Sequence, residues 1–291
     1  TEAPPQAEVA TQAAPAAQPD LMAGCKEETC ISAGTSLLNR PLGQGGRNTV
    51  DPSNRYGEYQ RSTRSANRGA DFLNSTGASV VAAADGKVIA AGDDSQTAYT
   101  NRNNEYGNLV ILEHNLPGVS APVYTLYAHL SEVLVNEGDT VEAGQEIGKV
   151  GMTGNVSGST LHFEVRVGEN SPDATVNPDL WLAPIQGKDG QLSGTLAGSI
   201  QDAEGNYIEM GNIVLELLAG PGQPARDQVY IQTYSDKKMR GRAPWEESFA
   251  VGELVPGTYQ VSFWLVDSMY QQVVEVEPGK QHILIVIICF Q

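Results

Sequence analysis

The stretch Gly158-Ser159-Thr160-Leu161-His162-Phe163-Glu164-Val165-Arg166-Val167 decides the fold of the middle of the chain. Its residues alternate with a period of two, which is the pattern of a half-buried β-strand. One face is apolar, and the other carries a hydroxyl, an imidazole, a carboxylate and a guanidinium in a row. A polar row on a rigid strand can hold a metal or a substrate, although a single histidine on a strand is more often structural. The polar face is therefore a candidate site.

The composition indicates a mostly β protein with room for two domains. The 291 residues include 31 Gly and 16 Pro, and they contain almost no long segment with an apolar period of 3.6 residues. The formal charge of −17 argues against binding to nucleic acid, which requires clustered Lys and Arg. No apolar run approaches the roughly 18–20 residues that cross a bilayer, so we expect no transmembrane segment.

The N-terminal residues predict a tether and a small disulfide loop. Residues 1–20 are mainly Ala, Pro, Gln, Thr and Glu, and they carry too little apolar surface to offset the entropy of ordering. We interpret them as a flexible, disordered tether, the alternative being a tail without a role. Because the chain begins at Thr1, we expect that a signal peptide or lipid anchor preceded it. The spacing of Cys25 and Cys30 fits a disulfide in an oxidising compartment, the alternative being two unrelated thiols.

Short strands and tight turns are expected through the middle of the chain. Two apolar runs flank Asp85-Gly86, and this dipeptide predicts a hairpin because a type I′ turn needs positive φ at both central positions. Residues 108–114 and 123–130 are predicted to form a neighbouring pair of strands. Glycines at short intervals in residues 135–151 favour a small barrel or sandwich, and residues 186–191 are interpreted as a linker.

The last third of the chain predicts a second β domain. From residue 188 to residue 291 short strands recur about every 8–12 residues, as in an antiparallel β-sandwich. This segment resembles the carboxypeptidase-regulatory-like sandwich, whose Pro-Gly-x-Tyr turn is matched by Pro256-Gly257-Thr258-Tyr259. We therefore predict an all-β chain with a tether at 1–20, a first domain with an N-terminal cover at 21–187 and a sandwich at 188–291. The sandwich would mediate contacts with a partner or a wall polymer, the alternative being a stabilising appendage.

Residues 67–182 resemble the lysostaphin-like (LytM-type) zinc endopeptidases, which cut peptide cross-links in bacterial peptidoglycan. The resemblance rests on several motifs, including Gly69-Ala70-Asp71-Phe72, Leu126-Tyr127-Ala128-His129-Leu130 and Leu161-His162-Phe163-Glu164-Val165-Arg166. It implies a LytM-type antiparallel β-sheet in a barrel-sandwich hybrid arrangement. It also implies a secreted protein at the cell surface or in the envelope of a bacterium.

The resemblance also implies which residues occupy the site. In the family, a His four residues before an Asp and the second His of a His-x-His strand hold zinc, whose bound water attacks the peptide carbonyl. By position, Asp71 and His162 match two of the ligands, and His129 matches one of two catalytic histidines. Asn67 stands at the place of the first ligand, and Thr160 stands at the first His of His-x-His. An amide is a poor zinc ligand beside imidazole, and a threonine hydroxyl cannot replace a catalytic imidazole.

These two replacements lead to the first two of three hypotheses, and the third comes from the Gly-Asp-x-Val-x-x-Gly-Gln pattern at 138–145. In the first, the domain is catalytically inactive, binds no metal, and serves as a binding or regulatory module for peptidoglycan or an envelope protein. In the second, it is an active zinc-dependent peptidoglycan endopeptidase whose altered site is rescued by a ligand such as His114 or Asn67. Arg68 is a candidate to neutralise Asp71 in place of a metal, although strand alternation directs it away. The third is a lipoyl or biotinyl carrier modified at Lys87, but the flanking carrier motif is absent.

Overall fold

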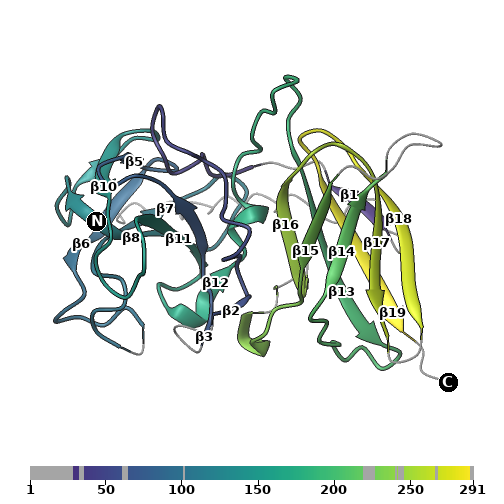
Figure 1. Ribbon diagram of the computed structural model, residues 1–291. Helices are drawn as coiled ribbons and strands as arrows, with labels where there is room; N and C mark the ends of the chain where they lie inside the picture. The colour runs from purple at the N-terminus through teal and green to yellow at the C-terminus, as the bar shows by residue number, and fades with distance from the viewer. Residues whose placement is uncertain are drawn as a thin grey trace, which may run out of the picture.

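The computed structural model describes residues 29–32, 36–60, 65–100, 102–218, 227–239, 241, 246–265 and 268–288. These residues form nineteen β-strands and three short 3₁₀-helices (Figure 1), which confirms the predicted all-β fold class. No helix in this described part of the chain is long and apolar enough to cross a membrane.

The elements follow one another as short strands with few interruptions. In chain order they are β1 (Thr29–Ser32), β2 (Tyr59–Gln60), β3 (Ser65–Ala66), β4 (Ala70–Leu73), β5 (Ser79–Val81), β6 (Gly86–Asp93), β7 (Asn108–His114), β8 (Val123–Val133), β9 (Thr140–Val141), β10 (Glu146–Val150), β11 (Thr160–Val167), η1 (Pro172–Ala174), β12 (Thr175–Val176), η2 (Pro178–Leu180), β13 (Gly194–Asp202), β14 (Ile213–Leu217), β15 (Gln228–Ile231), η3 (Lys237–Met239), β16 (Phe249–Leu254), β17 (Gly257–Trp264), β18 (Met269–Val276) and β19 (Gln281–Ile288).

A nine-stranded sheet organises the first half of the chain. Its main order is β12-β11-β8-β7-β6-β9, while β4 pairs with β11 and β10 pairs with β5 and β8. The antiparallel pairing of β7 with β8 confirms the strand pair predicted at 108–114 and 123–130. The hairpin predicted at Asp85-Gly86 is wrong, because β5 pairs with β10 whereas β6 pairs with β7 and β9. The Asp85 carboxylate instead accepts a hydrogen bond from the backbone N–H of Ala143 at 2.7 Å, in the loop between β9 and β10.

Strand β11 lies near the centre of this sheet, between β8 on one side and β4 and β12 on the other. Its apolar face packs into the core, where the Phe163 ring lies 5.3 Å from Tyr127 and 6.4 Å from Phe72, centroid to centroid. The predicted alternation is therefore present, but the strand is not half buried. Glu164 and Arg166 on the polar face are both 0% exposed, and they neutralise one another in an ion pair of 2.7 Å. Mutual pairing is what allows two charges to be buried together.

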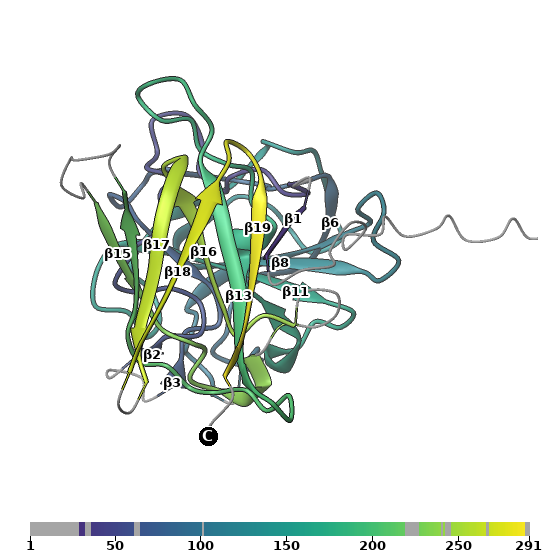
Figure 2. The same cartoon turned by 90° about the vertical axis from the view of Figure 1, so that its right-hand side faces the viewer.

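Two four-stranded sheets organise the second half. Their orders are β1-β19-β13-β16 and β15-β14-β17-β18, and side chains from both sheets form one hydrophobic cluster (Figures 1 and 2). Strand β1 pairs antiparallel with β19, so residues 29–32 add an edge strand here instead of covering the first domain. The boundary at residue 188 and the carboxypeptidase-regulatory-like resemblance stay predictions.

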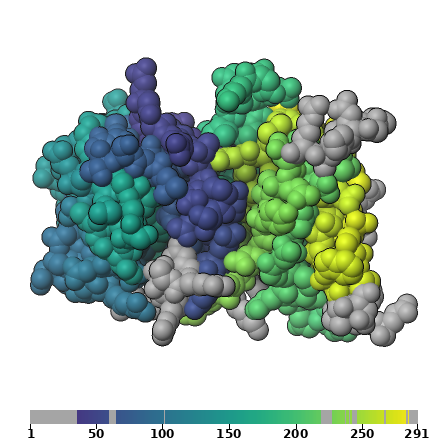
Figure 3. All heavy atoms as spheres, viewed as in Figure 1, coloured from purple at the N-terminus to yellow at the C-terminus, as the bar shows by residue number. Residues whose placement is uncertain are grey.

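The two halves of the chain lie against one another in the space-filling view (Figure 3), and hydrogen bonds join them. The backbone N–H of Gly252 donates to Asp179, the side-chain amide of Gln281 donates to the Leu180 carbonyl, and both bonds measure 2.8 Å. The segment predicted as a linker is a closed turn, in which the Gly187 N–H donates to the Gln191 carbonyl at 2.8 Å.

Tyr234 connects the second half to the first through a buried polar cluster. Its ring meets Tyr56 edge to face at 5.1 Å, its hydroxyl accepts a hydrogen bond from the Asn177 side chain at 3.0 Å, and it donates to Glu247 at 3.4 Å. Burial of the Glu247 carboxyl raises its pKa from 4.5 to about 8, against the smaller lowering effect of its hydrogen bonds.

This buried carboxyl predicts how stability depends on pH. The folded protein keeps a proton on Glu247 that the unfolded chain releases, so the contribution is complete below about pH 4.5 and is lost as the pH rises toward 8. We expect Glu247→Gln, compared with the unaltered chain, to lose less of its free energy of unfolding between pH 5 and pH 8.5. Urea unfolding at several pH values measures this. Glu204→Gln, at an exposed turn, is the control and should follow the unaltered chain; identical curves for all three proteins would contradict the prediction.

Candidate functional site

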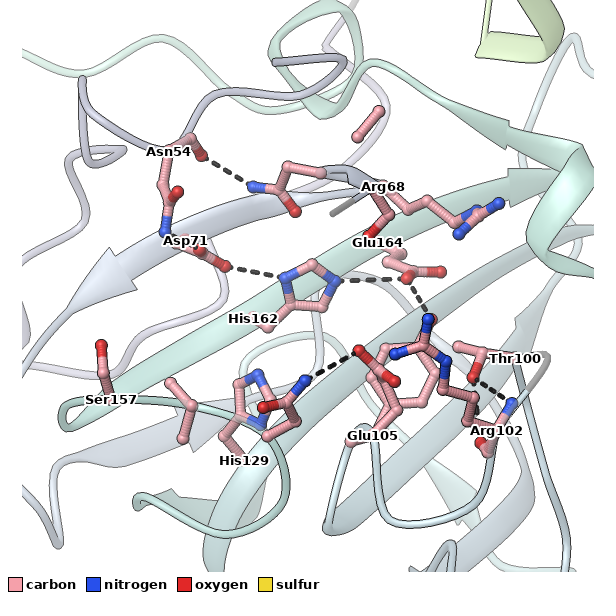
Figure 4. Close-up of a pocket in the computed structure, with 16 residues that line it drawn as sticks. Asn54, Arg68, Asp71, Thr100, Arg102, Glu105, His129, Ser157, His162 and Glu164 are labelled. Atoms are coloured by element: carbon pink, nitrogen blue, oxygen red, sulfur yellow. Dashed lines mark hydrogen bonds and ion pairs between the residues drawn. The ribbon is translucent and has the colours of Figure 1, made fainter. Parts of the chain in front are cut away.

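A groove of about 370 Å³ opens beside the polar face of β11 (Figure 4). Strands β4, β8 and β11 form its floor, and the loops around residues 54, 102 and 156 form its walls. The residues that line it are Asn54, Ser65, Ala66, Asn67, Arg68, Asp71, Thr100, Arg102, Glu105, Tyr106, His129, Asn155, Val156, Ser157, His162 and Glu164.

Pairing of β4 with β11 brings the two predicted metal ligands together. Asp71 and His162 are direct partners in the antiparallel register, so their side chains leave the sheet on the same face. His162 Nδ1 donates to Asp71 Oδ1 at 2.7 Å, and both residues are buried. The aspartate and histidine that the sequence places 91 residues apart thus form one hydrogen-bonded pair.

The other nitrogen of His162 is engaged as well. Its Nε2 lies 3.2 Å from Glu164 Oε1, and Glu164 in turn binds Arg166 and accepts the hydroxyl of Tyr106. Burial alone would lower the pKa of His162, but its hydrogen bonds and charge interactions with Asp71 and Glu164 raise that pKa to about 10. The ring is therefore a cation at neutral pH that donates from both nitrogens. It also stacks on the Tyr106 ring at 5.8 Å, which favours the charged form.

Asn54 and Asn67 occupy the other side of Asp71. Asn54 Nδ2 donates to Asp71 Oδ2 at 2.7 Å, so each carboxylate oxygen has a partner. Asn67 is buried, and its Nδ2 donates to the Asn54 carbonyl at 2.8 Å. Asn67 thus fixes the backbone of the loop that carries Asn54. It stands four residues before Asp71, as predicted, but makes hydrogen bonds within the protein.

His129 lies on the groove floor with a neutral ring. Its Nδ1 donates to the Thr153 carbonyl at 2.8 Å, which leaves the lone pair on Nε2. Burial and the nearby positive charge of His162, 5.8 Å away between ring centroids, lower the pKa of His129 to about 4. The backbone of His129 is left-handed, with a φ of 63°, where the pairing of β8 with β7 and β10 shifts register. Such strain persists only where the surrounding structure enforces it.

The structure separates Thr160 from the other predicted site residues. Thr160 begins β11 and is buried, yet it does not line the groove. Its hydroxyl donates to the carbonyl of Leu161 at 3.5 Å. Four of the five positions implied by the resemblance, Asn67, Asp71, His129 and His162, therefore line the groove, while Thr160 does not.

The donor set does not fit a zinc ion. A zinc-bound histidine must offer a lone pair, but each ring nitrogen of His162 lies within hydrogen-bond distance of a carboxylate, Asp71 at 2.7 Å and Glu164 at 3.2 Å. Asp71 is shared between His162 and Asn54, and Asn67 supplies an amide where imidazole would be needed. Within the described ranges, no group of three or more His, Cys, Asp or Glu side chains is arranged to hold a metal.

The suggested substitutes lie elsewhere. His114 is fully buried in β7, where its ring nitrogens contact the Asp85 carbonyl at 2.8 Å and the Thr125 hydroxyl at 2.7 Å. It does not line the groove, so it cannot replace a missing ligand. Arg68 lines the groove, but its Nε donates to the carbonyl of Pro172 at 3.2 Å, and Asp71 is neutralised by His162 instead.

Several groove residues carry no signal in the sequence. Asn54 lies in an irregular loop, and only the folded structure brings it to Asp71. Arg102 and Asn155 lie in loops on the opposite wall, where Asn155 Nδ2 donates to Glu105 at 3.2 Å. In the sequence, Glu164 is recognisable only as a member of the polar row. Its contact with His162 is known only from the folded structure. Cys25, one of the two cysteines of the predicted Cys25–Cys30 disulfide, lies outside the described residues. The predicted tether lies outside them as well.

Known proteins resemble the part of the chain that forms the groove. Residues 65–177 match peptidase family M23. Over 116 residues the chain is 41% identical to the murein hydrolase activator NlpD of Salmonella dublin. The matched segment covers 40% of this chain and 26% of that protein. It is 39% identical over 117 residues to the peptidoglycan DD-endopeptidase ShyB of Vibrio cholerae, which is 40% of this chain and 24% of that protein. The chain thus spans about a quarter of the length of these two relatives.

A shorter relative is covered almost completely. Lipoprotein NlpD of Yersinia enterocolitica is 39% identical over 112 residues, which is 38% of this chain and 97% of that protein. Among solved structures, the catalytic domain of lysostaphin from Staphylococcus simulans is 33% identical, with 43% of this chain and 85% of that chain covered at a TM-score of 0.37. The family match and the coverage of the Yersinia lipoprotein confirm the resemblance carried by the sequence motifs, and this chain belongs to peptidase family M23.

Proposed function

We propose that this chain is a catalytically inactive M23 protein that acts as a binding or regulatory module in the bacterial cell envelope. One observation carries the proposal: Asp71 and His162, which match two zinc ligands of the family, are hydrogen-bonded to each other at 2.7 Å. The charge that a metal would bring is supplied by a proton on His162, which Glu164 holds from the other side.

The remaining groups support binding better than hydrolysis. Cleavage of a peptide needs an activated nucleophile and donors aimed at the oxyanion that develops. His129 is neutral and can accept a proton, but Thr160 does not line the groove and both nitrogens of His162 are occupied. A single proton acceptor without an activated water does not provide a hydrolytic site.

The groove suits a peptide that carries carboxylate groups. Arg68 and Arg102 line it, in a chain that has only 18 basic residues against 35 acidic ones. The names of the relatives refer to murein or peptidoglycan, so we propose peptidoglycan, or an envelope protein that acts on it, as the partner. The name of the Yersinia relative, a lipoprotein, supports an envelope location, and we propose residues 1–20 as a tether.

An active, zinc-dependent endopeptidase is the alternative, and the ShyB relative is by name a peptidoglycan DD-endopeptidase. For this chain it would require a third imidazole or carboxylate ligand near Asp71 and His162. His114 does not line the groove, and in the described part of the chain no three His, Cys, Asp or Glu side chains are arranged to hold a metal.

The proposed function predicts binding to peptidoglycan without cleavage. We expect purified sacculi to retain the full chain in a sedimentation assay, and no soluble muropeptides to be released with added zinc. Arg102→Ala should weaken retention several-fold, because it removes an exposed cation from the groove without removing a side-chain contact of the fold. The matched control is Arg47→Ala, an exposed arginine outside the groove, which should bind as the unaltered chain does. Zinc-dependent release of muropeptides would overturn the proposal.

Because no imidazole stands four residues before Asp71, we can predict the zinc content of the unaltered chain and of three variants. After incubation with stoichiometric zinc and desalting, we expect about no zinc in the unaltered chain and in Thr160→His. Asn67→His and the double variant should retain close to one zinc per chain, because they restore the imidazole four residues before Asp71. Elemental analysis measures the content. If the unaltered chain already retains one zinc, the conclusion that these residues do not fit a zinc ion is wrong. That result would favour the endopeptidase alternative.

The charge state of the two groove histidines can be observed directly. In ¹⁵N NMR spectra at pH 7.5, His162 should show both ring nitrogens protonated, whereas His129 should show a neutral ring with the proton on Nδ1. The pKa of His162 is raised, so its contribution to stability is complete at low pH and is lost only as the pH approaches 10. Asp71→Asn should lower the pKa of His162. A neutral His162 in the unaltered chain at pH 7.5 would contradict this prediction.

A further inference from the structure

The outer face of the sheet β15-β14-β17-β18 carries exposed aromatic side chains that the groove does not use. Trp264 is 66% exposed and Tyr230 is 58% exposed. Along β17, Tyr259, Val261 and Phe263 point inward and are buried, so the residues between them, including Trp264, point outward. Figure 2 shows β15, β17 and β18 side by side in this sheet.

The register places both rings on the same face. Tyr230 is opposite Val214, Val214 is opposite Ser262, and Ser262 is opposite Gln271, which makes one row across four strands. Trp264 lies two residues beyond Ser262 on β17 and is opposite Met269. With strands about 4.8 Å apart and a rise of about 3.3 Å per residue, the Cα atoms of Tyr230 and Trp264 are about 12 Å apart.

Among the residues that the structure describes, the half of the face that carries the rings has no charged side chain. Its members are Tyr230, Val214, Ser262, Gln271, Trp264 and Met269. The acidic side chains of this face, Glu216 and Glu275, lie in the rows beyond, and no lysine or arginine belongs to the paired residues of these four strands. In a chain with a net charge of −17, this surface excludes anionic polymers and anionic membranes and offers no counter-charge to a basic partner beside the rings.

Aromatic rings and neutral polar groups are mixed on this face. The Tyr230 hydroxyl donates to Gln228 Oε1 at 2.6 Å, which fixes the ring in one orientation before any ligand arrives. Ser262 lies two residues from Trp264 on β17, and Gln271 is the partner of Ser262 on β18, so a hydroxyl and an amide lie beside the Trp264 ring in the register. An apolar surface interrupted by such groups differs from the continuous apolar core of a protein interface.

We propose that this face binds an uncharged glycan chain. A pyranose ring has an apolar face of C–H groups and a rim of hydroxyl groups, so it can stack on Trp264 or Tyr230 while its rim bonds the neighbouring amide and hydroxyl. The separation of about 12 Å between the two residues spans more than one sugar unit, which requires a chain and not a monosaccharide. The groove is not involved, so the proposal does not depend on the function proposed for it.

The test uses the full chain and penta-N-acetylchitopentaose, an uncharged, soluble β-1,4-linked oligosaccharide. We expect isothermal titration calorimetry to detect binding and the fluorescence of the chain to change on addition. Trp264→Ala and Tyr230→Ala should each weaken binding by about tenfold or more, since large aromatic side chains carry most of the energy of such contacts. Both side chains are exposed, so the thermal unfolding midpoint should stay unchanged.

Two matched controls separate this surface from the rest of the molecule. Tyr59→Ala removes a 53% exposed tyrosine outside this sheet and should leave the affinity for the oligosaccharide unchanged. Arg102→Ala, in the groove, should do the same, so a failure of the groove proposal leaves this result intact. The proposal is overturned if the unaltered chain does not bind at millimolar oligosaccharide or if Trp264→Ala binds equally well. It is also overturned if sedimentation shows a dimer that Trp264→Ala dissolves, because the occupant is then a second copy.

Discussion

The hydrogen bond between His162 and Asp71 is the contact on which the rest of the groove depends. It joins a side chain of β4 to a side chain of β11, two strands whose backbones are already paired. It also places a cationic ring between two carboxylates. Charges alternate along the buried row from Asp71 through His162 and Glu164 to Arg166, so the row is neutral as a whole. Removal of one member would leave its neighbour buried without a partner, which costs about 3–5 kcal/mol in comparable cases.

This alternation explains how the groove can keep two buried carboxylates on one strand face and a neighbouring strand. Two carboxylates and no cation could not share a buried strand face, because each would be protonated or would unfold the site. The proton on His162 fills that need, and Arg166 balances the second carboxylate from below. Burial would raise the pKa of Glu164, but Arg166 and His162 lower it to about 2, so the carboxylate stays charged and continues to hold the imidazolium.

The sequence predicts the features of this arrangement that depend on residue periodicity or on a family motif. It does not predict those that depend on contacts between segments far apart in the chain. Alternation identifies β11 and its two faces, and the family motifs bring Asp71 to His162. Alternation does not reveal that Glu164 and Arg166 on the polar face are buried, because their burial depends on the ion pair between them. The Asp85-Gly86 hairpin fails for a related reason: a turn dipeptide sets the local backbone, while the partner of each strand is decided by the sheet. No local pattern indicates that Asn54 reaches Asp71 or that residues 29–32 pair with β19.

The loop from residue 50 to residue 58 shows why the groove and the second half form one structural unit. At one end of this loop the Val50 N–H donates to Glu253 of β16, and at the other the Gly57 carbonyl accepts from Ser235. Between them, Asn54 binds Asp71 in the groove. Glu253 has a left-handed backbone, with a φ of 62°, and its carboxylate is held by Arg40 at 2.5 Å as well as by the loop. Strain of this kind is maintained by surrounding contacts. The wall of the groove is therefore held from both halves of the chain, and a first domain cut at residue 187 would lose the contacts of Glu253 and Ser235 at the two ends of this loop.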